Sequence, residues 1–375
     1  SHFGVIMKIE FDKKAEDLFK KICLRRDDSL TASDFYNAFL QENYADLTSL
    51  DLKTMSKENG ISLSQAYFSC LLQDIGATIS DLGTSLRNNR LEIVHELDSK
   101  TYSCNAYLKN VNPLKAKQGS LSLIKNTFLP YEGFIYKDVE ASKEDYYSEI
   151  NHLGFFSQAF DYLELVDKER IWMSITPYEI ETMKSSIAKA KGKVVTFGLG
   201  LGYFAYMCLQ KEDVDEVTVI DNNETIINLF NKNIYPFFNH KNKFNIIKAD
   251  AYSFLKSKDI QKYDYLFIDL YHDENDGLPF YLNMKKEIPS SLNYDFWIEN
   301  SFIVYIRRIM IALIEECLDG SKDSDYLNPK SIEDKLFSGI YDLTKDVELK
   351  DSDSLLEFLS DDNIRNIAKK WSLAL

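Results

Sequence analysis

The chain has 375 residues, of which 45% are hydrophobic and 27% are charged, and its formal net charge at pH 7 is −15. This length predicts a main domain with one or two appended pieces. The negative charge argues against an extended contact with nucleic-acid phosphates, because proteins that bind nucleic acids gather Lys and Arg on one face. We therefore expect a small-molecule substrate and do not expect a nucleic-acid partner.

The five cysteines are scattered and form no CxxC pair, so the sequence predicts neither a metal site nor a disulfide framework. No basic region followed by an apolar stretch opens the chain, as a secretory signal would require. Ser301 to Leu318 is the most apolar helical segment, but Arg307 and Arg308 in its middle indicate a core helix instead of a membrane span. We expect a cytoplasmic protein without membrane contact, and the sequence is compatible with a homodimer.

Three flanking regions surround the segment that carries the motifs. Residues 1–97 show apolar residues three and four apart, which predicts helices, with Ser33 and either Ser62 or Ser64 as N-caps. In residues 98–143 apolar and polar positions alternate with a shorter period, and turn residues divide the pattern into short runs. This pattern predicts a small antiparallel sheet. Residues 320–375 are acidic and are expected to form a helical tail.

The central region, residues 144–319, is predicted to hold a Rossmann-like domain. From Lys193 onward, five short apolar runs alternate with helical stretches. Successive strand-helix units imply a parallel sheet with right-handed crossovers and helices on both faces. The predicted fold class is therefore α/β, with a doubly wound sheet.

A glycine-rich turn follows the first of these strands, in VVTFGLGLGYF, with Gly198, Gly200 and Gly202 at alternate positions. Glycines there let the backbone approach a ligand closely. The dinucleotide fingerprint GxGxxG would need its third glycine where this chain has Tyr203. The pattern therefore differs from the fingerprint of a dinucleotide site.

Two acidic residues at later strand ends narrow the choice of nucleotide. Asp221 ends VTVID about twenty residues after the glycines, where a carboxylate accepts ribose hydroxyls. Asp250 ends IIKAD and is followed by Ala251, whose backbone NH could face an adenine edge. This second acidic position is not part of the dinucleotide fingerprint.

In these four segments, VVTFGLGLG, VTVID, IIKADAYSFL and YDYLFIDL, the chain resembles the class I S-adenosylmethionine-dependent methyltransferase superfamily. KYDYLFIDLYHD and LVDKERIWMSITPYEIETM are most similar to its spermidine-synthase-like branch, and the resemblance covers Tyr162 to Leu318. It implies a methyltransferase-type sheet with S-adenosylmethionine as cofactor. The cofactor-binding residues it implies are Gly198, Leu199, Gly200, Gly202, Tyr203, Asp221, Asn222, Asp250, Ala251 and Ser174.

Four departures separate the chain from that branch. Thr196 stands where many members carry an acidic residue, and the glycine turn lacks the aspartate of polyamine synthases. Glu181 to Met183 replace the tyrosine-histidine-glutamate run of those enzymes, and no closing hairpin follows the fifth strand-helix unit. These differences count against aminopropyl transfer.

The catalytic candidates follow the fourth strand, in Asp269-Leu270-Tyr271-His272-Asp273. The resemblance implies that Asp269 positions an amine acceptor. Tyr271, His272 and Asp273 add a hydrogen-bonding phenol, a titratable imidazole and a second carboxylate within a few residues. The simpler interpretation is that Asp269 caps a turn and that His272 and Asp273 are solvated.

Glu179 is the fourth catalytic candidate. With Thr176 it has the spacing of a capping box at the start of a helix, which is the simpler interpretation. The resemblance instead brings Ser174 and Glu179 to the methionine end of the cofactor. Glu299 and Asn300 are expected on the rim of the pocket, whereas Trp297 and Cys208 are expected in the core.

The leading hypothesis is therefore an S-adenosylmethionine-dependent methyltransferase that acts on a small molecule. One alternative is aminopropyl transfer from decarboxylated S-adenosylmethionine to a polyamine, which the negative charge of the chain would suit. Another is a non-catalytic nucleotide-sensing module whose flanking regions bind a partner.

Overall fold

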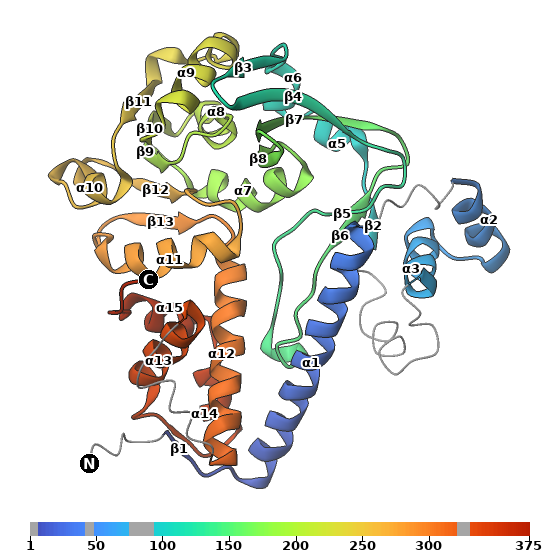
Figure 1. Cartoon of the computed structure of the whole chain (residues 1–375), viewed down its shortest axis with the longest axis vertical. Helices are drawn as coiled ribbons and strands as arrows, with labels where there is room; N and C mark the ends of the chain where they lie inside the picture. The colour runs from blue at the N-terminus through green and yellow to red at the C-terminus, as the bar shows by residue number, and fades with distance from the viewer. Residues whose placement is uncertain (1–6, 42–48, 75–93, 321–330) are drawn as a thin grey trace.

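The computed structural model describes residues 7–41, 49–74, 94–320 and 331–375. A five-stranded parallel sheet with the order β11-β10-β9-β12-β13 lies in the upper part of the view in Figure 1. The strands are β9 (Gly192–Phe197), β10 (Val214–Asp221), β11 (Phe244–Lys248), β12 (Tyr265–Ile268) and β13 (Asn293–Phe296). This arrangement confirms the predicted doubly wound α/β fold.

The strand order fixes where a ligand site can form. The chain runs from β9 outward to β11 and then returns to β12 on the other side of β9, so the winding reverses beside β9. All four residues of β12 are buried, as a central parallel strand covered on both faces requires. The helices that follow the five strands are α8 (Tyr203–Leu209), α9 (Glu224–Asn233), α10 (Ala251–Leu255), α11 (Glu274–Met284) and α12 (Glu299–Asp319). Short 3-10 helices cover Tyr235–Phe237, Lys241–Lys243, Lys258–Lys262 and Lys285–Glu287.

An antiparallel sheet precedes this domain and leads into it through α7 (Pro177–Lys189). Its order is β3-β4-β7-β8, with β3 (Ala116–Gln118), β4 (Leu121–Phe128), β7 (Phe160–Asp167) and β8 (Arg170–Ser174). A smaller sheet joins β2 (Val94–Glu96), β6 (Leu153–Phe155) and β5 (Phe134–Ile135), and Lys143–Asp145 form a 3-10 helix. β4 and β7 pair in antiparallel fashion although residue 143, where the sequence suggested a domain boundary, lies between them in the chain.

Residues 99–110 are helical, so the strand predicted there is wrong. They form α5 (Ser99–Ser103) and α6 (Ala106–Asn110). Asp98 accepts a hydrogen bond from the backbone of Lys100, and Asn105 accepts from Tyr107 and Leu108. These N-caps satisfy amide groups that a short helix leaves open, and they outweigh the alternating pattern of the side chains.

The N-terminal helices are α1 (Lys13–Gln41), α2 (Ser49–Asn59) and α3 (Leu63–Asp74). Ser33 lies inside α1, so the N-cap predicted at that position is wrong. Ser62 caps α3, because its Oγ accepts from the backbone amide of Gln65 at 3.1 Å. Ser64 lies within the first turn of the same helix.

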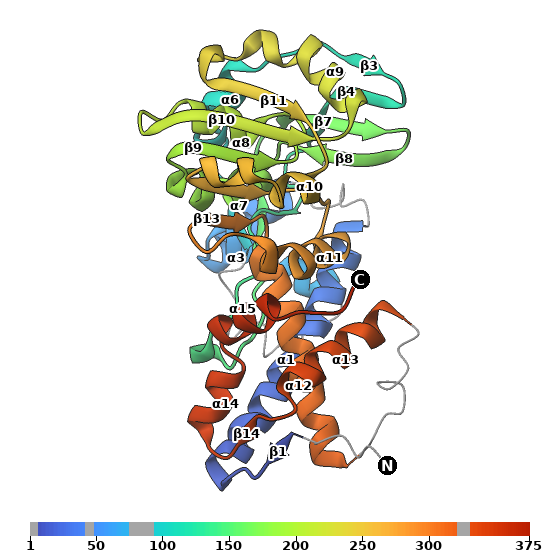
Figure 2. The same ribbon diagram turned by 90° about the vertical axis from the view of Figure 1, so that its left-hand side faces the viewer.

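The C-terminal region forms α13 (Ile332–Thr344), α14 (Ser352–Phe358) and α15 (Asp361–Lys369) (Figure 2). α13 and α15 pack against α12, whereas α14 packs against α1. Between α13 and α14, β14 (Glu348–Leu349) pairs in parallel with β1 (Lys8–Ile9). Arg307, which argued against a membrane span, is buried and donates from Nε to the carbonyl of Leu359 at 2.8 Å. No helix in the described ranges combines the length and apolar character that a membrane crossing requires.

Candidate functional site

A cavity of about 610 Å³ opens at the carboxyl ends of β9, β10 and β12, where the winding reverses. Its other walls are β8 and the first turn of α7. Ten of the expected site residues line it: Ser174, Glu179, Gly198, Leu199, Gly200, Asp221, Asn222, Asp269, Tyr271 and His272. Gly202, Tyr203, Asp250 and Ala251 are not among the lining residues.

The glycine turn after β9 forms the floor of the cavity. Gly198 has a φ angle of 99°, and a Cβ atom there would lie 2.0 Å from the carbonyl oxygen of Asp269. Gly200 has a φ of 51°, and its Cβ would lie 2.3 Å from Sδ of Met173. Both positions require glycine, because the backbone is in a left-handed region and a neighbour occupies the space.

Replacing Gly198 by alanine should lower the free energy of unfolding by about 3 kcal/mol or more, because strain and a backbone collision add up. Gly320 offers a matched control, since it also has a positive φ (67°) but a Cβ added there would meet no atom within 4 Å. Gly320→Ala should lose only about 1 kcal/mol. Urea unfolding measures both, and equal losses would contradict the close approach at Gly198.

Asp221 connects the glycine turn to the end of β10. Its Oδ2 accepts from the backbone amide of Leu199 at 2.9 Å, and its Oδ1 accepts from that of Asn223 at 2.8 Å. Burial raises the pKa of Asp221, although these two amides oppose the shift. Each carboxylate oxygen can accept a further hydrogen bond, so Asp221 can hold the turn and a ligand hydroxyl together.

Two carboxylates, those of Glu179 and Asp269, share the cavity. Burial raises the pKa of Asp269 to about 7, and the charge of Asp276 adds to the shift. Burial also raises the pKa of Glu179 well above its usual value, followed by the charge of Asp269. Within the described ranges neither carboxylate has a hydrogen-bond or ion-pair partner, so the pair is suited to a positively charged ligand.

The capping-box interpretation of Glu179 is wrong. Thr176 does occupy the N-cap of α7 and Pro177 its first position, but the Thr176 side chain makes no capping hydrogen bond. Glu179 is instead buried, with 6% of its surface exposed, and lines the cavity. Tertiary packing thus turns this side chain inward, which the local spacing does not reveal.

Tyr271 and His272, two candidate side chains in the loop after β12, make different contacts. The hydroxyl of Tyr271 donates to the backbone carbonyl of Trp297 at 2.5 Å, which fixes the phenol in the core. His272 lies with Nδ1 2.8 Å from Oδ2 of Asp276, and its ring meets that of Trp172 edge-on at 5.0 Å. His272 is therefore oriented and half-buried instead of freely solvated, whereas Tyr271 holds the loop against β13.

Asp273 is the one member of this loop that matches the simpler interpretation. It is exposed, and as N-cap of α11 it forms a capping box with Asp276. Its side chain still reaches the rim of the cavity. The charge of this rim is therefore negative.

Met173 and Trp172 of β8 are cavity residues that the sequence did not indicate. The Sδ atom of Met173 accepts from the backbone amide of Leu201 at 3.1 Å, so this thioether covers the glycine turn. No local motif marks these residues, because their position depends on how the antiparallel sheet packs against the parallel one.

The expected residues outside the cavity have structural contacts. Gly202 begins α8, where a Cβ would lie 2.6 Å from the ring of Phe230. The hydroxyl of Tyr203 accepts from Nδ2 of Asn105 at 2.8 Å. Asp250 caps α10 by accepting from the amide of Ser253 at 2.8 Å, and Ala251 is the first residue of that helix.

Ser174 lines the cavity but is also bound elsewhere. Its Oγ donates to Oε2 of the buried Glu164 at 2.7 Å, and Oε1 of Glu164 accepts from Asn126. This chain of hydrogen bonds fixes the end of β8 beside the cavity. Ser174 therefore presents a fixed hydroxyl to a ligand.

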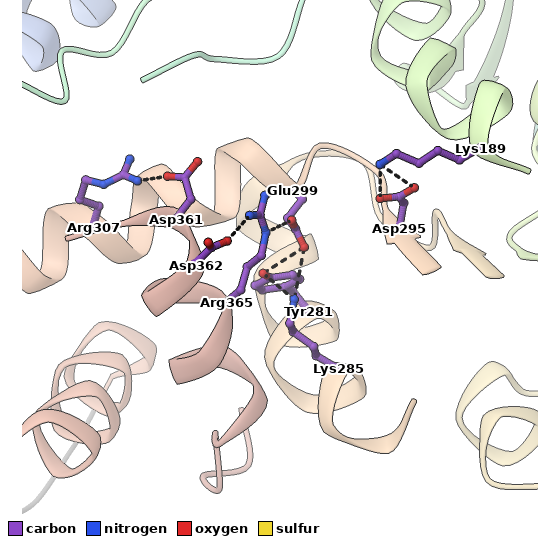
Figure 3. Close-up of polar contacts among 9 residues, drawn as sticks. All are labelled: Lys189, Tyr281, Lys285, Asp295, Glu299, Arg307, Asp361, Asp362 and Arg365. Carbon is purple, nitrogen blue, oxygen red and sulfur yellow. Dashed lines mark hydrogen bonds and ion pairs between the residues drawn. The ribbon is translucent and has the colours of Figure 1, made fainter. Parts of the chain in front are cut away.

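Glu299 was expected on the rim, but it is the first residue of α12 and does not line the cavity. Its carboxylate accepts from Nε of Arg365 at 2.8 Å, from the hydroxyl of Tyr281 at 3.2 Å and from Nζ of Lys285 at 3.3 Å (Figure 3). Asn300 follows it in α12 and does not line the cavity either. Trp297 reaches the cavity wall and donates from Nε1 to Oγ1 of Thr182 at 2.8 Å.

No group of three or more His, Cys, Asp or Glu side chains in the described ranges is arranged to hold a metal ion. The groups that the cavity presents to a ligand are carboxylates, backbone amides and aromatic rings.

No protein-family model and no curated protein matches the chain. Among solved structures it is similar to spermidine synthase from Thermotoga maritima, with 14% identity, a TM-score of 0.27, and coverage of 40% of this chain and 59% of that one. It is also similar to a spermidine synthase in complex with the transition-state analogue AdoDATO, with 13% identity, a TM-score of 0.28, and coverage of 48% and 71%. The chain thus spans less than two thirds of the first of these proteins, and the similarity concerns the fold alone.

Proposed function

We propose that the protein transfers a methyl group from S-adenosylmethionine to an amine of a small molecule. The observation that carries this proposal is the pair Glu179 and Asp269, two carboxylates without a partner in the described structure that face the cavity beside the glycine turn. Among the described residues, the acidic side chains along the cavity are Glu179, Asp221, Asp269 and Asp273, and the basic ones are Arg170 and His272. Such a cavity favours positively charged ligands, which a sulfonium and an ammonium both are.

The residues present fit an adenosyl donor. Gly198 and Gly200 leave the backbone of the turn open to close approach, and Asp221 keeps lone pairs for ribose hydroxyls. Asn222 and Ile226 extend this side of the cavity. When bound, S-adenosylmethionine would supply a methyl carbon already activated by the positive sulfur, so the protein must mainly align the acceptor.

Asp269 is the group that we assign to the acceptor amine. An ammonium has no free lone pair, so a proton must leave the nitrogen before transfer. With its pKa at about 7, the Asp269 carboxylate is ionised in part at neutral pH and can bind the ammonium and then accept its proton. Glu179 adds a second negative charge when ionised, while Trp172 and Met173 cover the site against water.

Aminopropyl transfer is the second candidate, and a specific observation favours it. Decarboxylated S-adenosylmethionine lacks the carboxylate of the methionine end, and in the described part of the chain Arg170 is the one permanently charged cation that lines the cavity. Such a cavity suits a donor without that carboxylate. The missing motif residues around Glu181 to Met183 keep this function behind methyl transfer.

Calorimetric titration of the full chain with S-adenosylmethionine, its decarboxylated form and NAD tests these functions. Tighter binding of S-adenosylmethionine supports methyl transfer, and tighter binding of the decarboxylated form supports aminopropyl transfer. Binding of NAD alone, or of none of the three, contradicts both. Transfer of a labelled methyl group to any amine would remove the alternative of a non-catalytic sensing module.

Asp221→Ala should weaken S-adenosylmethionine binding about tenfold or more, because hydrogen bonds to a charged group are lost and the glycine turn loses its anchor. Asp250→Ala is the matched control, since Asp250 caps α10 and does not line the cavity. It should lower stability by about 1 kcal/mol and leave the affinity unchanged. An unchanged affinity in Asp221→Ala would show that the donor does not contact this carboxylate.

A further inference from the structure

A buried carboxylate lies behind the wall of the cavity, in the antiparallel sheet. Glu164 of β7 is only 3% exposed and stands directly opposite Ser174 of β8 in the register of the two strands. Its hydrogen bonds within the described ranges come from the Ser174 hydroxyl at 2.7 Å and from Nδ2 of Asn126 at 3.2 Å. Burying a carboxylate without a cation destabilises a sheet, because nothing offsets the loss of solvation. The presence of Glu164 here therefore needs a reason other than packing.

Asn126 fixes one oxygen of this carboxylate. Oδ1 of Asn126 accepts from the backbone amide of Thr127 at 2.8 Å, so its amide nitrogen is the group that faces Glu164. One oxygen of Glu164 is thus held by Asn126, and the other is left for Ser174. The network has a fixed polarity, with both donors directed at the carboxylate.

This polarity determines what Ser174 can offer to the cavity that it lines. A hydroxyl has one proton and two lone pairs, whereas a carboxylate only accepts hydrogen bonds. Since the proton of Ser174 is directed to Oε2 of Glu164, only lone pairs remain for a bound molecule. A ligand group that contacts Ser174 must therefore be a hydrogen-bond donor.

The neighbouring residue indicates which part of a ligand lies near Ser174. Met173 precedes it in β8, and the Sδ atom of Met173 accepts from the amide of Leu201 in the glycine turn at 3.1 Å. The end of β8 therefore lies beside the part of the cavity that we assign to the methyl donor. Outside its adenosine, S-adenosylmethionine carries one group that donates hydrogen bonds strongly, which is its α-ammonium.

We infer that Glu164 is a positioning residue for the methyl donor: by accepting the proton of Ser174, it makes Oγ of Ser174 an acceptor for the α-ammonium of S-adenosylmethionine. This inference rests on the proposed function, because it takes S-adenosylmethionine as the ligand of the cavity. Ser174 makes the contact, and Glu164 acts through it. The negative charge behind the hydroxyl strengthens the contact, since hydrogen bonds in a chain polarise one another.

Calorimetry on the full chain compares S-adenosylmethionine with its deaminated analogue, in which hydrogen replaces the α-amine. Ser174→Ala should weaken binding of S-adenosylmethionine about tenfold, as expected for one hydrogen bond to a charged group. Binding of the analogue should stay within about twofold of wild type. In steady-state rates the loss should appear in KM for S-adenosylmethionine with kcat nearly unchanged, because the contact exists before and during transfer.

Glu164→Gln reverses the polarity while it keeps the shape of the side chain. Asn126 still needs an acceptor, so the new amide oxygen faces Asn126 and the new amide nitrogen donates to Ser174. The proton of Ser174 then turns toward the cavity and opposes an ammonium. Glu164→Gln should weaken S-adenosylmethionine binding about tenfold or more. Glu169→Gln, in the exposed turn between the same two strands, is the control and should leave both affinities unchanged.

The double variant shows whether Glu164 acts through Ser174. Adding Glu164→Gln to Ser174→Ala should increase the loss by no more than about twofold, because the hydroxyl that Glu164 orients is already absent. A further loss of about tenfold would show that Glu164 acts independently of Ser174 and would overturn the inference.

Two other results would also overturn it. Equal losses for S-adenosylmethionine and its deaminated analogue in Glu164→Gln would assign Glu164 to the stability of the sheet. An unchanged affinity in Ser174→Ala would exclude the contact itself, whether or not Glu164→Gln folds. Failure of the wild type to bind S-adenosylmethionine would instead overturn the proposed function, and this inference with it.

Discussion

Asp269→Asn is expected to reduce amine methylation by a factor of about 10² to 10⁴ in kcat, the range for loss of a general base, and to make the protein more stable at pH 8. The two effects have one cause. The carboxylate of Asp269 is buried in the cavity, next to the charge of Asp276, and is ionised only against a cost in solvation. Asparagine cannot accept the proton, but it also carries no charge.

The pH dependence of stability follows from the direction of the shift. The pKa of Asp269 rises from 3.8 to about 7 on folding, so the folded state holds a proton that the unfolded state releases. The contribution of this carboxyl is fully present below the unfolded value and is lost as pH rises through about 7. Asp269→Asn should therefore gain about 4 kcal/mol over the wild type between pH 4 and pH 8.

Urea unfolding at several pH values measures this gain, and initial rates with a monoamine measure the loss of transfer. Wild-type kcat should rise with pH through about 7, as the Asp269 carboxylate forms. Asp215→Asn is the control, because Asp215 is exposed near the start of β10, at the opposite end of the sheet. A stability below that of wild type at pH 8, or an unchanged kcat, would contradict the assigned environment and role.

Glu299→Gln is expected to destabilise the protein by about 3 kcal/mol, because it leaves Lys285 with no carboxylate in a buried position. Only 2% of the Lys285 side chain is exposed, and its Nζ contacts Glu299 and Tyr281 (Figure 3). The same carboxylate binds Arg365, so α15 also loses an anchor on α12. This effect concerns the fold and not the reacting groups.

The pH dependence again has a definite sign. Burial alone would raise the pKa of Glu299, but Lys285 and Arg365 more than offset it and the pKa is lowered. Its contribution is therefore present at neutral pH and is lost as pH falls below the usual value of 4.5. Urea unfolding should show a large difference from wild type at pH 7 that shrinks in acid. Glu212→Gln, on an exposed turn, should change little, and an equal loss there would contradict the network.

The parts of the fold that the sequence predicts correctly depend on local pattern. Alternating apolar runs and helical stretches predict the parallel sheet. Gly198, Asp221 and Asp269 stand at the ends of the motifs and therefore lie at one edge of this sheet. Adjacent carboxyl ends of parallel strands make this outcome a matter of topology. The position of these residues in the cavity wall could therefore be predicted without reference to the flanking regions.

The features that sequence reasoning missed depend on contacts between distant segments. The spacing around Glu179 is that of a capping box, but burial against the parallel sheet turns the side chain into the cavity. Tyr271 was predicted to offer its phenol to a substrate, yet its hydroxyl donates to the carbonyl of Trp297, 26 positions later. The Sδ atom of Met173, in the antiparallel sheet, accepts a hydrogen bond from the amide of Leu201, in the turn after the first parallel strand. Such contacts leave no periodic trace in the chain.

The pairing of β1 with β14 joins segments near the two ends of the described chain. Arg26 of α1 forms an ion pair with Glu315 of α12, so the N-terminal region is also joined to the last helix of the parallel-sheet domain. α14 packs directly against α1, so the C-terminal helices help to hold this N-terminal helix in place. The N-terminal and C-terminal flanks are therefore structurally interdependent, because each holds part of the other in place.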